Sequence, residues 1–392
     1  MNIVILSRNP KLYSTSRLVE ACKKRGHDPH VFDTLKFSIF VEGGNPTLHY
    51  NTRPFDDPDA VIPRIGASIT MYGTAVVRQF EQMGVFCLTA SHAITVSRDK
   101  LRSIQIMSRH RIGLPKTAFV RMKSAVLPAI TEVGGAPVVI KLLEGTQGIG
   151  VILADQTKIA EAIIETLQST RQNVLIQSFV KESRGRDIRA FVVGGKVVAA
   201  MRRTASDGEF RANVHRGASA EGIKLEPDYE HAALQAAQIM GLRVAGVDML
   251  ESKDGPLILE VNSSPGLFGI ETATGVDVAG EIVKHIEEEV LFPEVDIRQR
   301  LTLHSGYGVS EIPVTPTSPM VGKALRQIGL REKDILVLSI MRGSVTLPNP
   351  RGDDQVMSGD TLVCFGKLLA LRGLLPPTPQ KRVKRKTTAK TK

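Results

Sequence analysis

Cysteine is scarce in this sequence, and long apolar runs do not occur. The chain has 392 residues and three cysteines, which lie far apart and form no ligand-spaced pair. This usage argues against a disulfide framework and is typical of a reduced protein. No apolar run approaches the roughly 20 residues of a membrane span, and residues 2–6 predict a first strand because they lack the basic region and cleavage site of a signal peptide. We therefore expect a cytoplasmic protein without a membrane segment.

Two common nucleotide-binding signatures are also missing. No Gly-x-Gly-x-x-Gly follows the first strand, and no Gly-Lys-Ser/Thr opens a helix, which argues against a dinucleotide site there and against a P-loop. A different glycine-rich loop, residues 144–150, lies between two expected strands and follows Lys141. The backbone N–H groups of such a loop suit phosphate binding, with Gly145 and Gly148 as candidate contacts. A flexible hairpin tip is the alternative.

Positive charge is concentrated at the C-terminal end. The formal net charge is +11, and residues 381–392 supply seven of these charges without an acid. Basic tails of this kind often contact RNA or other polyanions, whereas others only solubilise a terminus, and both interpretations stay open. Beginning with two prolines, residues 376–392 are expected to be disordered.

The pattern of expected elements divides the chain into domains. Strands and helices alternate near the N-terminus, which predicts a small parallel sheet with helices packed on it. Ser14 or Thr15 is expected to cap its first helix, which Gly26 can end. Residues 93–110 are expected to form one helix. The predicted units are an N-terminal α/β domain (1–95), a catalytic domain (96–292), a small α+β domain (300–373) and the tail (376–392).

The strongest chemical signal is an expected β-hairpin at residues 246–262. Two runs rich in apolar and β-branched residues flank a polar turn. Folding about this turn places Asp248 almost opposite Glu260, and Asn262 shares their face because side chains alternate along a strand. Four apolar neighbours are expected on the other face: Val247, Met249, Leu259 and Val261.

These three oxygen ligands predict a metal site. Carboxylates between apolar neighbours are costly to bury without a partner. Two carboxylates and an amide suit Mg²⁺ or Mn²⁺, which are usually completed by phosphate oxygens. An edge hairpin with two solvated acids, Asp248 and Glu260, is the alternative.

Further motifs of the sequence are Lys100, the segments 177–180, 187–189 and 211–213, and the run 259–266. Taken together, all these motifs resemble the ATP-grasp ligases, and among them the RimK-type α-L-glutamate ligases that act on a ribosomal protein. The resemblance covers residues 1 to about 290 and implies an ATP-grasp fold behind a small parallel α/β domain, with ATP and two Mg²⁺ or Mn²⁺ ions as cofactors. It implies phosphate contacts from Lys100 and Lys141 and ribose contact from Asp187. The other implied site residues are Gln177, Ser178, Phe179 and Val180 for adenine, Arg211, Ala212 and Asn213 for the phosphates and acyl intermediate, and Asp248, Glu260 and Asn262 for the metals.

Residues from about 305 to 366 resemble a second family, the C-terminal regulatory domain of TrkA-type potassium-uptake proteins. The match is carried by residues 311–314, 319–325 and 358–363. RimK enzymes of the shorter type lack such a domain, so its presence predicts an additional layer of regulation.

The chemistry explains why so many cations accompany the motif. A carboxylate must be activated before an amine can replace one of its oxygens, and ATP achieves this through an acyl phosphate. Four arginines, Arg189, Arg202, Arg203 and Arg211, exceed what ATP needs. We infer that some bind substrate carboxylates, with Arg203 and Arg211 as the candidate catalytic residues. His215 is either the acceptor of the amine proton or a structural histidine.

The predicted activity is ATP-dependent addition of L-glutamate. The expected acceptor is the C-terminus of a small-subunit ribosomal protein or a growing poly-glutamate chain, and we expect a homo-oligomer. Two alternatives stay open, a different ATP-grasp amide ligase, such as a glutathione-synthetase-like or amino-adipate-carrier enzyme, and a regulator that binds ATP without turnover.

Overall fold

The computed structural model describes residues 1–110, 112–143, 150–206, 210, 218–291, 307–343 and 345–375. The chain divides into two units, Met1–Pro293 and Glu294–Lys392, and each is described by itself. In the described ranges, no helix is long and apolar enough to cross a membrane.

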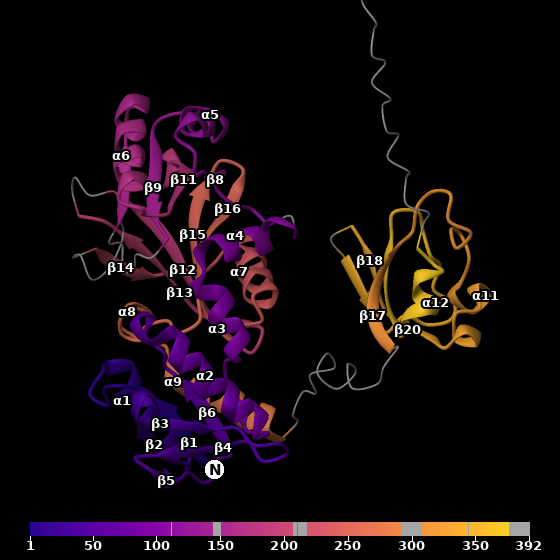
Figure 1. The fold of residues 1–392 in the computed structure, drawn as a ribbon, viewed down its shortest axis with the longest axis horizontal. Coiled ribbons are helices and arrows are strands. Elements are labelled where there is room, and N and C mark those ends of the chain that lie inside the picture. The colour runs from indigo at the N-terminus through magenta and orange to yellow at the C-terminus, as the bar shows by residue number, and fades with distance from the viewer. Residues whose placement is uncertain are drawn as a thin grey trace, which may run out of the picture. The chain divides into compact units, whose positions relative to one another are not determined.

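The first unit begins with a parallel sheet in the strand order β2-β1-β6-β7. Residues 3–6 of its central strand are fully buried, as expected of a parallel strand covered on both faces. This confirms the predicted N-terminal α/β fold (Figure 1). The elements are β1 (Asn2–Leu6), α1 (Tyr13–Lys24), β2 (Asp28–Phe32), β6 (Ala60–Pro63), α2 (Thr70–Gln82) and β7 (Phe86–Cys87).

The start of α1 differs from the predicted cap. The N-cap is Leu12, without a side-chain cap, so the helix begins before Ser14 and Thr15. Ser14 Oγ instead accepts a hydrogen bond from Leu267 N at 3.0 Å, and Thr15 Oγ1 bonds Ser7 Oγ at 2.9 Å. Both hydroxyl groups thus form hydrogen bonds with partners outside the helix and do not cap its N-terminus.

A small antiparallel sheet that was not predicted follows β2. It has the strand order β3-β4-β5 and interrupts the alternation of strands and helices. Its side of the domain holds an aromatic cluster in which Phe32 and Phe37 contact Tyr50 and Phe55. The elements are the 3₁₀ helix η1 (Thr34–Lys36), β3 (Phe37–Phe40), β4 (Thr47–Tyr50) and β5 (Arg53–Pro54).

The expected single helix at 93–110 is wrong, because two helices form with a break at Asp99. Asp99 is extended (φ −86°, ψ 100°) and its side chain accepts from Arg102 N at 3.0 Å, which caps the second helix. Aspartate competes with helical hydrogen bonding in this way and favours a helix N-terminus. The two helices are α3 (Ser91–Arg98) and α4 (Lys100–Ser108).

Two antiparallel sheets complete the ATP-grasp fold, which confirms the predicted fold class. The smaller has the order β10-β9-β11-β8 and is covered by α5 and α6 (Figure 1). Its elements are β8 (Thr117–Phe119), α5 (Val126–Glu132), β9 (Val138–Leu142), β10 (Val151–Ala154), α6 (Thr157–Ser169) and β11 (Val174–Ser178).

The larger sheet has the order β14-β13-β12-β15-β16. Helix α7 buries four alanines on one face against it, and their small side chains permit a close approach. Its elements are β12 (Arg186–Val193), β13 (Lys196–Thr204), β14 (Ser219–Gly222), α7 (Pro227–Ile239), β15 (Val244–Ser252) and β16 (Gly255–Asn262).

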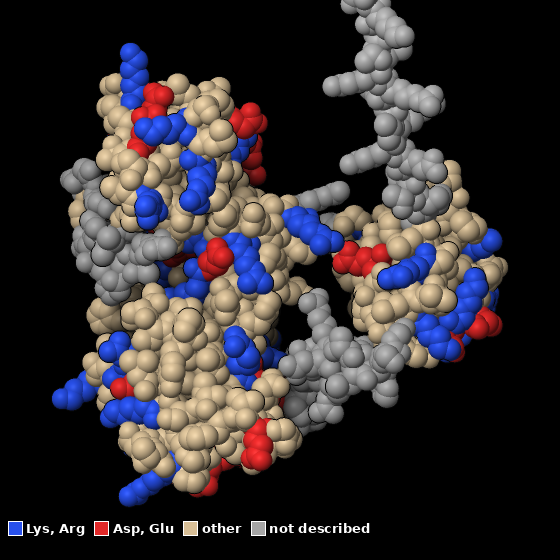
Figure 2. All heavy atoms as spheres, in the orientation of Figure 1, with Lys and Arg blue, Asp and Glu red and all other residues tan. Residues whose placement is uncertain are grey.

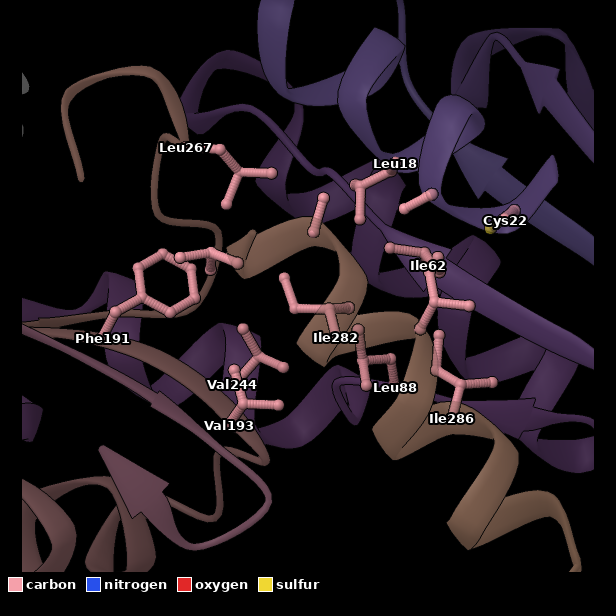
Figure 3. Close-up of a cluster of buried hydrophobic side chains, with 14 of the residues drawn as sticks. Leu18, Cys22, Ile62, Leu88, Phe191, Val193, Val244, Leu267, Ile282 and Ile286 are labelled. Carbon is pink, nitrogen blue, oxygen red and sulfur yellow. The ribbon is translucent and has the colours of Figure 1, made fainter. Parts of the chain in front are cut away.

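The last helix of the first unit packs against both the parallel sheet of the N-terminal domain and the large antiparallel sheet. Helix α9 (Val278–Leu291), which follows α8 (Phe268–Thr274), buries Ile282 and Ile286 in a cluster that includes Ile62 from the parallel sheet. Phe191 of β12 belongs to the same cluster (Figure 3). The N-terminal domain and the large sheet therefore share one core.

The second unit is an antiparallel sheet in the order β17-β20-β18-β19 with short helices. Its core includes Ile312, Ile340 and Leu362. Residues 319–322 form turns, and a short helix begins at Leu325. The elements are β17 (Tyr307–Pro313), α11 (Leu325–Ile328), β18 (Ile335–Arg342), β19 (Val345–Pro348), β20 (Thr361–Lys367) and α12 (Leu368–Arg372).

Candidate active site

The β15–β16 hairpin brings the predicted metal ligands together. Asp248 pairs directly with Glu260, and Asn262 pairs with Gly246 one step further along the same face. Asn262 Nδ2 donates to Glu260 Oε1 at 3.0 Å. The predicted convergence of these three side chains is confirmed.

One of the four expected core neighbours is wrong. A bulge after the Asp248–Glu260 pair shifts the register, so Met249 pairs with Ile258 and Leu259 is the extra residue. Ile258 is 1% exposed in the core, while Leu259 is only half-buried. The other three neighbours are buried as expected: Val247, Met249 and Val261.

Asp248 is held by two arginines in a buried network. Arg189, opposite it on β12, donates from Nε and Nη2 to its two oxygens at 2.6 Å each. Arg203 Nη2 lies 3.1 Å from Asp248 Oδ2. Burial raises the pKa of Asp248, but the charges of Arg189 and Arg203 outweigh it and hold the pKa well below its usual range. Asp248 is therefore ionised at neutral pH.

Arg203 also joins Asp248 to Asp187. Its Nε and Nη2 donate to the two Asp187 oxygens at 2.6 and 2.9 Å, and Asp187 and Arg203 are 6% and 3% exposed. Burial raises the pKa of Asp187, against the lowering effect of Arg203. The expected ribose contact by Asp187 and substrate contact by Arg203 would both require this pair to open.

Two lysines approach the hairpin from other elements. Lys100, the first residue of α4, donates from Nζ to Leu142 O at 2.9 Å, which brings it beside the strand that contains Lys141. Burial lowers the pKa of Lys141 to about 8, and the nearby Lys100 charge adds to this while Glu260 opposes it. Both lysines thus lie within electrostatic reach of Glu260.

The segment expected to line adenine connects the small sheet to the large one. Gln177 is buried, and its Nε2 donates to Thr117 Oγ1 at 2.9 Å. Ser178 N donates to Lys116 O at 2.9 Å, so this amide is not free to read an adenine edge. An adenine contact by the backbone N–H of Ser178 would require this hydrogen bond to break.

A cavity of about 430 Å³ borders this segment. Ser178, Phe179 and Val180 line it together with Pro137 and Leu257. None of the predicted phosphate and metal residues that the structure describes is among its lining residues: Lys100, Lys141, Asp248, Glu260 and Asn262.

Two arginines near the hairpin were not predicted. Arg64 directly follows β6, and Arg98 ends α3, two residues before Lys100. The Arg98-Asp99-Lys100 run was available as a signal, because an aspartate that starts a new helix turns the residues on its two sides in different directions. In Figure 2, basic side chains gather in the hollow between the part of the first unit with α5 and α6 and the part with α1 and β2.

The donor set fits a divalent cation. Asp248 and Glu260 are directly paired across the hairpin, and Asn262, which contacts Glu260, adds an amide oxygen. Hard oxygen donors of this kind suit Mg²⁺ or Mn²⁺. Within the described ranges, no group of three His, Cys, Asp or Glu side chains is placed to hold a metal, and this site has two carboxylates and an amide.

Several predicted residues lie outside the described ranges. They are Gly145 and Gly148 of the glycine-rich loop, Arg211, Ala212 and Asn213 of the expected phosphate segment, His215, and the tail residues 376–392.

Comparison with known proteins assigns three parts of the chain to family domains. Residues 1–94 match the RimK PreATP-grasp domain, residues 97–286 the RimK-like ATP-grasp domain and residues 309–371 the TrkA-C domain. Among solved structures, the ATP-grasp ligase PsnB, complexed with a phosphomimetic variant of minimal precursor, Mg and ADP, has a TM-score of 0.58 at 22% identity, over 74% of this chain and 98% of that one. This likeness shows the shared fold.

Curated relatives are much more similar in sequence. A "Probable alpha-L-glutamate ligase" from Rhodopirellula baltica is 59% identical over 381 residues, which are 97% of this chain and 94% of that protein. A protein of the same name from Marinomonas sp. is 57% identical over 288 residues, 74% of this chain and 96% of that protein, so it is too short for a third domain of this size. ATP-grasp ligases use ATP and Mg²⁺. The chain belongs to the RimK family of ATP-grasp α-L-glutamate ligases and carries a C-terminal TrkA-C domain.

Proposed function

We propose that this ligase adds L-glutamate, through an acyl phosphate, to the C-terminus of a small-subunit ribosomal protein or to a growing poly-glutamate chain. The observation that carries the proposal is the cationic surrounding of the metal hairpin. The charge of Glu260 acts on Arg98, Lys100 and Lys141, and Arg64 lies close enough to Arg98 for their charges to interact, so four cations lie in the region of one exposed carboxylate. Such an excess favours polyanionic substrates: a triphosphate and an acidic acceptor.

The chain's own residues would divide the work. Asp248, Glu260 and Asn262 would hold two Mg²⁺ or Mn²⁺ ions, which neutralise phosphate charge when bound. Lys100 and Lys141 would neutralise further phosphate oxygens and so stabilise the charge that develops during transfer.

The reaction has two balanced steps. An oxygen of the acceptor carboxylate attacks the γ-phosphorus, and ADP leaves with the bonding electron pair. The glutamate amine then attacks the acyl carbon, the C–N bond forms, the C–O bond to phosphate breaks, and the amine loses a proton to water. Positioning and charge stabilisation are the main contributions that a protein makes to such a transfer.

Three further features complete the proposal. The basic tail contacts a polyanion such as ribosomal RNA. The protein is a homo-oligomer. A cytoplasmic location agrees with cysteines that are all unpaired and buried.

Mass spectrometry tests the activity directly. The protein is incubated with ATP, Mg²⁺, glutamate and either a ribosomal-protein C-terminal peptide or short glutamate oligomers. We expect a ladder of products spaced by one glutamyl unit, and a matched reaction with Glu260→Gln protein shows none. Release of ADP with a different amino acid in place of glutamate would contradict the proposal, as would glutamylation of neither acceptor.

A further inference from the structure

Two arginines beside the metal hairpin form no ion pair with any described carboxylate. Arg64 comes from the parallel-sheet domain and Arg98 from the end of α3. Arg64 Nη2 donates to Pro265 O at 2.9 Å, and Arg98 Nη2 donates to Ile65 O at 2.6 Å. Both acceptors are neutral carbonyls, and Arg98 Nε is buried without a partner among the described residues. Within the part of the chain that the structure describes, neither guanidinium therefore has a carboxylate within hydrogen-bonding distance.

Other inward-facing arginines of this unit show what compensation looks like. Each has a carboxylate within hydrogen-bonding distance: Arg17 with Glu271, Arg189 with Asp248, and Arg203 with Asp187. Burial lowers the pKa of Arg64 to about 10, and the charge of Arg98 adds to this effect. A half-buried pair of like charges is costly unless an anion joins it.

The position in the parallel sheet also favours a ligand. In the order β2-β1-β6-β7, the chain leaves β1 toward β2 on one side and returns to β6 on the other. Arg64 directly follows β6, and its N–H donates to Leu6 O at the end of β1. Ligands of open α/β sheets bind outside the carboxyl ends of the strands at such a switch point. Arg64 thus lies where this fold places a small-molecule site.

The pair is distinct from the phosphate region. The charge of Glu260 contributes to the pKa of Arg98, Lys100 and Lys141, whereas the charge that contributes to the pKa of Arg64 is that of Arg98. The hydrogen bonds show the same separation. Lys100 donates to Leu142 O of β9 in the small sheet, whereas Arg98 donates to Ile65 O, just after β6 of the parallel sheet, and Arg64 donates to Pro265 O. An anion held by both arginines would lie on the side of the metal hairpin that faces the parallel sheet.

We propose that Arg64 and Arg98 bind a carboxylate of the incoming glutamate and so direct its amine toward the activated acceptor at the hairpin. The inference rests on the proposed function. A guanidinium binds a carboxylate through two parallel hydrogen bonds, which orients as well as attracts it. Holding the glutamate carboxylate here also keeps it away from the phosphoryl donor, so the acceptor carboxylate is the one activated.

Steady-state kinetics with full-length protein tests this assignment. In Arg64→Gln and Arg98→Gln, we expect the KM for glutamate to rise about 10- to 100-fold, the range expected when one charged hydrogen-bonding partner is lost, while the KM for ATP stays within about threefold. Arg25→Gln is the matched control, because Arg25 pairs with Glu287 on the far side of the same domain. Its glutamate KM should not change.

A second variant guards against misfolding, since both arginines also bind backbone carbonyls. Arg64→Lys keeps the charge and loses the two-pronged geometry, so it should retain the melting temperature and still show a raised glutamate KM. A raised KM for ATP with an unchanged KM for glutamate would overturn the proposal and assign the pair to phosphate. A wild-type protein that incorporates no glutamate would instead overturn the proposed function, before any variant is compared.

Discussion

Asp248 and Glu260 share the hairpin face but differ in what the fold requires of them. Asp248 is 2% exposed and neutralises two arginines, whereas Glu260 is exposed and its carboxylate bonds Asn262. We expect Glu260→Gln to lower turnover by at least about 1,000-fold, because a lost metal clamp costs several kcal/mol in the transition state. Its melting temperature should stay within about 2 °C of the wild type. ATP turnover near the wild-type rate would remove Glu260 from the metal site.

Asp248→Asn should also abolish turnover, but with a cost in stability. The change leaves Arg189 and Arg203 buried without their shared carboxylate, and breaking such a buried pair costs about 3–5 kcal/mol. Urea unfolding checks this cost. Because the folded state lowers the pKa of Asp248, this stability difference between wild type and variant also depends on pH. The wild type should be more stable above the unfolded pKa of about 4, and the difference should disappear as the pH falls through the folded pKa. Equal stability of the two proteins at neutral pH would contradict the network described here.

The lowered pKa of Lys141 leads us to expect that nucleotide binding depends on pH. Its pKa is lowered to about 8 by burial, so the ammonium that attracts phosphate is lost as the pH rises through this value. The affinity for a non-hydrolysable ATP analogue should be highest below about pH 8 and fall up to about tenfold per pH unit above it. Calorimetric titration between about pH 7 and pH 9.5 measures this slope.

Lys141→Arg is the matched control for this titration, because a guanidinium stays charged over the whole range. The slope should disappear in that variant. A slope that persists would assign the titration to another group, such as Lys100, whose pKa burial also lowers. In Lys141→Ala, affinity should fall at every pH, with little loss of melting temperature in the absence of nucleotide.

At the scale of elements, the hairpin depends on a close approach by the segment after α4. Gly113 O accepts from Ile258 N at 2.8 Å, and a Cβ on Gly113 would lie 2.3 Å from Pro256 O. Gly113→Ala should therefore destabilise the protein by about 1–3 kcal/mol, because a strand backbone cannot move aside as a side chain can. The melting temperatures of the two proteins measure this loss. Gly43→Ala is the matched control and should not lower the melting temperature, because its Cβ would meet no atom within 4 Å. Equal melting temperatures would mean that the segment can shift without cost.

The break between α3 and α4 is the element that organises the charges. A continuous helix would place residues 98 and 100 about 200° apart on one cylinder, since each residue turns about 100°. The extended Asp99 instead starts a new helix, so Lys100 reaches Leu142 O and Arg98 reaches Ile65 O. The positions of Lys100 and Arg98 thus depend on one capping residue, Asp99.

At the scale of the molecule, the C-terminal unit is expected to be separable from the chemistry. The described site residues all belong to the unit Met1–Pro293, and a relative of similar sequence spans little more than that unit. Protein truncated near residue 300 should therefore fold and still glutamylate small acceptors. Circular dichroism together with the mass-spectrometric ladder measures both. Folded but inactive truncated protein would mean that the TrkA-C domain completes the active site.

Binding by the basic tail, residues 381–392, can be recognised by its dependence on salt. Any affinity for an anionic partner that is lost with residues 381–392 should weaken steeply with added salt, because seven positive charges release counterions on binding. Binding at two salt concentrations, with and without the tail, measures this. A loss of affinity that does not depend on salt would rule out an electrostatic contact.

Local sequence patterns were sufficient to predict the helices and strands whose apolar residues recur with a regular period. The alternation of strands and helices predicted the parallel sheet, and the two-residue period of the hairpin placed Asp248 opposite Glu260, because a strand's side-chain directions depend on its own backbone. The register failed only past the bulge, where Leu259 was added. Family resemblance supplied the rest of the predicted site.

Tertiary structure alone decided which charged groups meet. Arg203 and Asp187 lie on adjacent strands, yet only the folded sheet shows them bonded to each other and buried. Ser14 was available as a helix cap until Leu267, 253 residues away, supplied a competing donor. Arg64 and Arg98 come together because the parallel sheet and α3 pack beside each other. Such contacts depend on long-range packing, which produces no periodic pattern in the sequence. The sequence by itself therefore determined which chemistry to expect. Only the folded structure determined which of the residues are paired with one another and which are available for that chemistry.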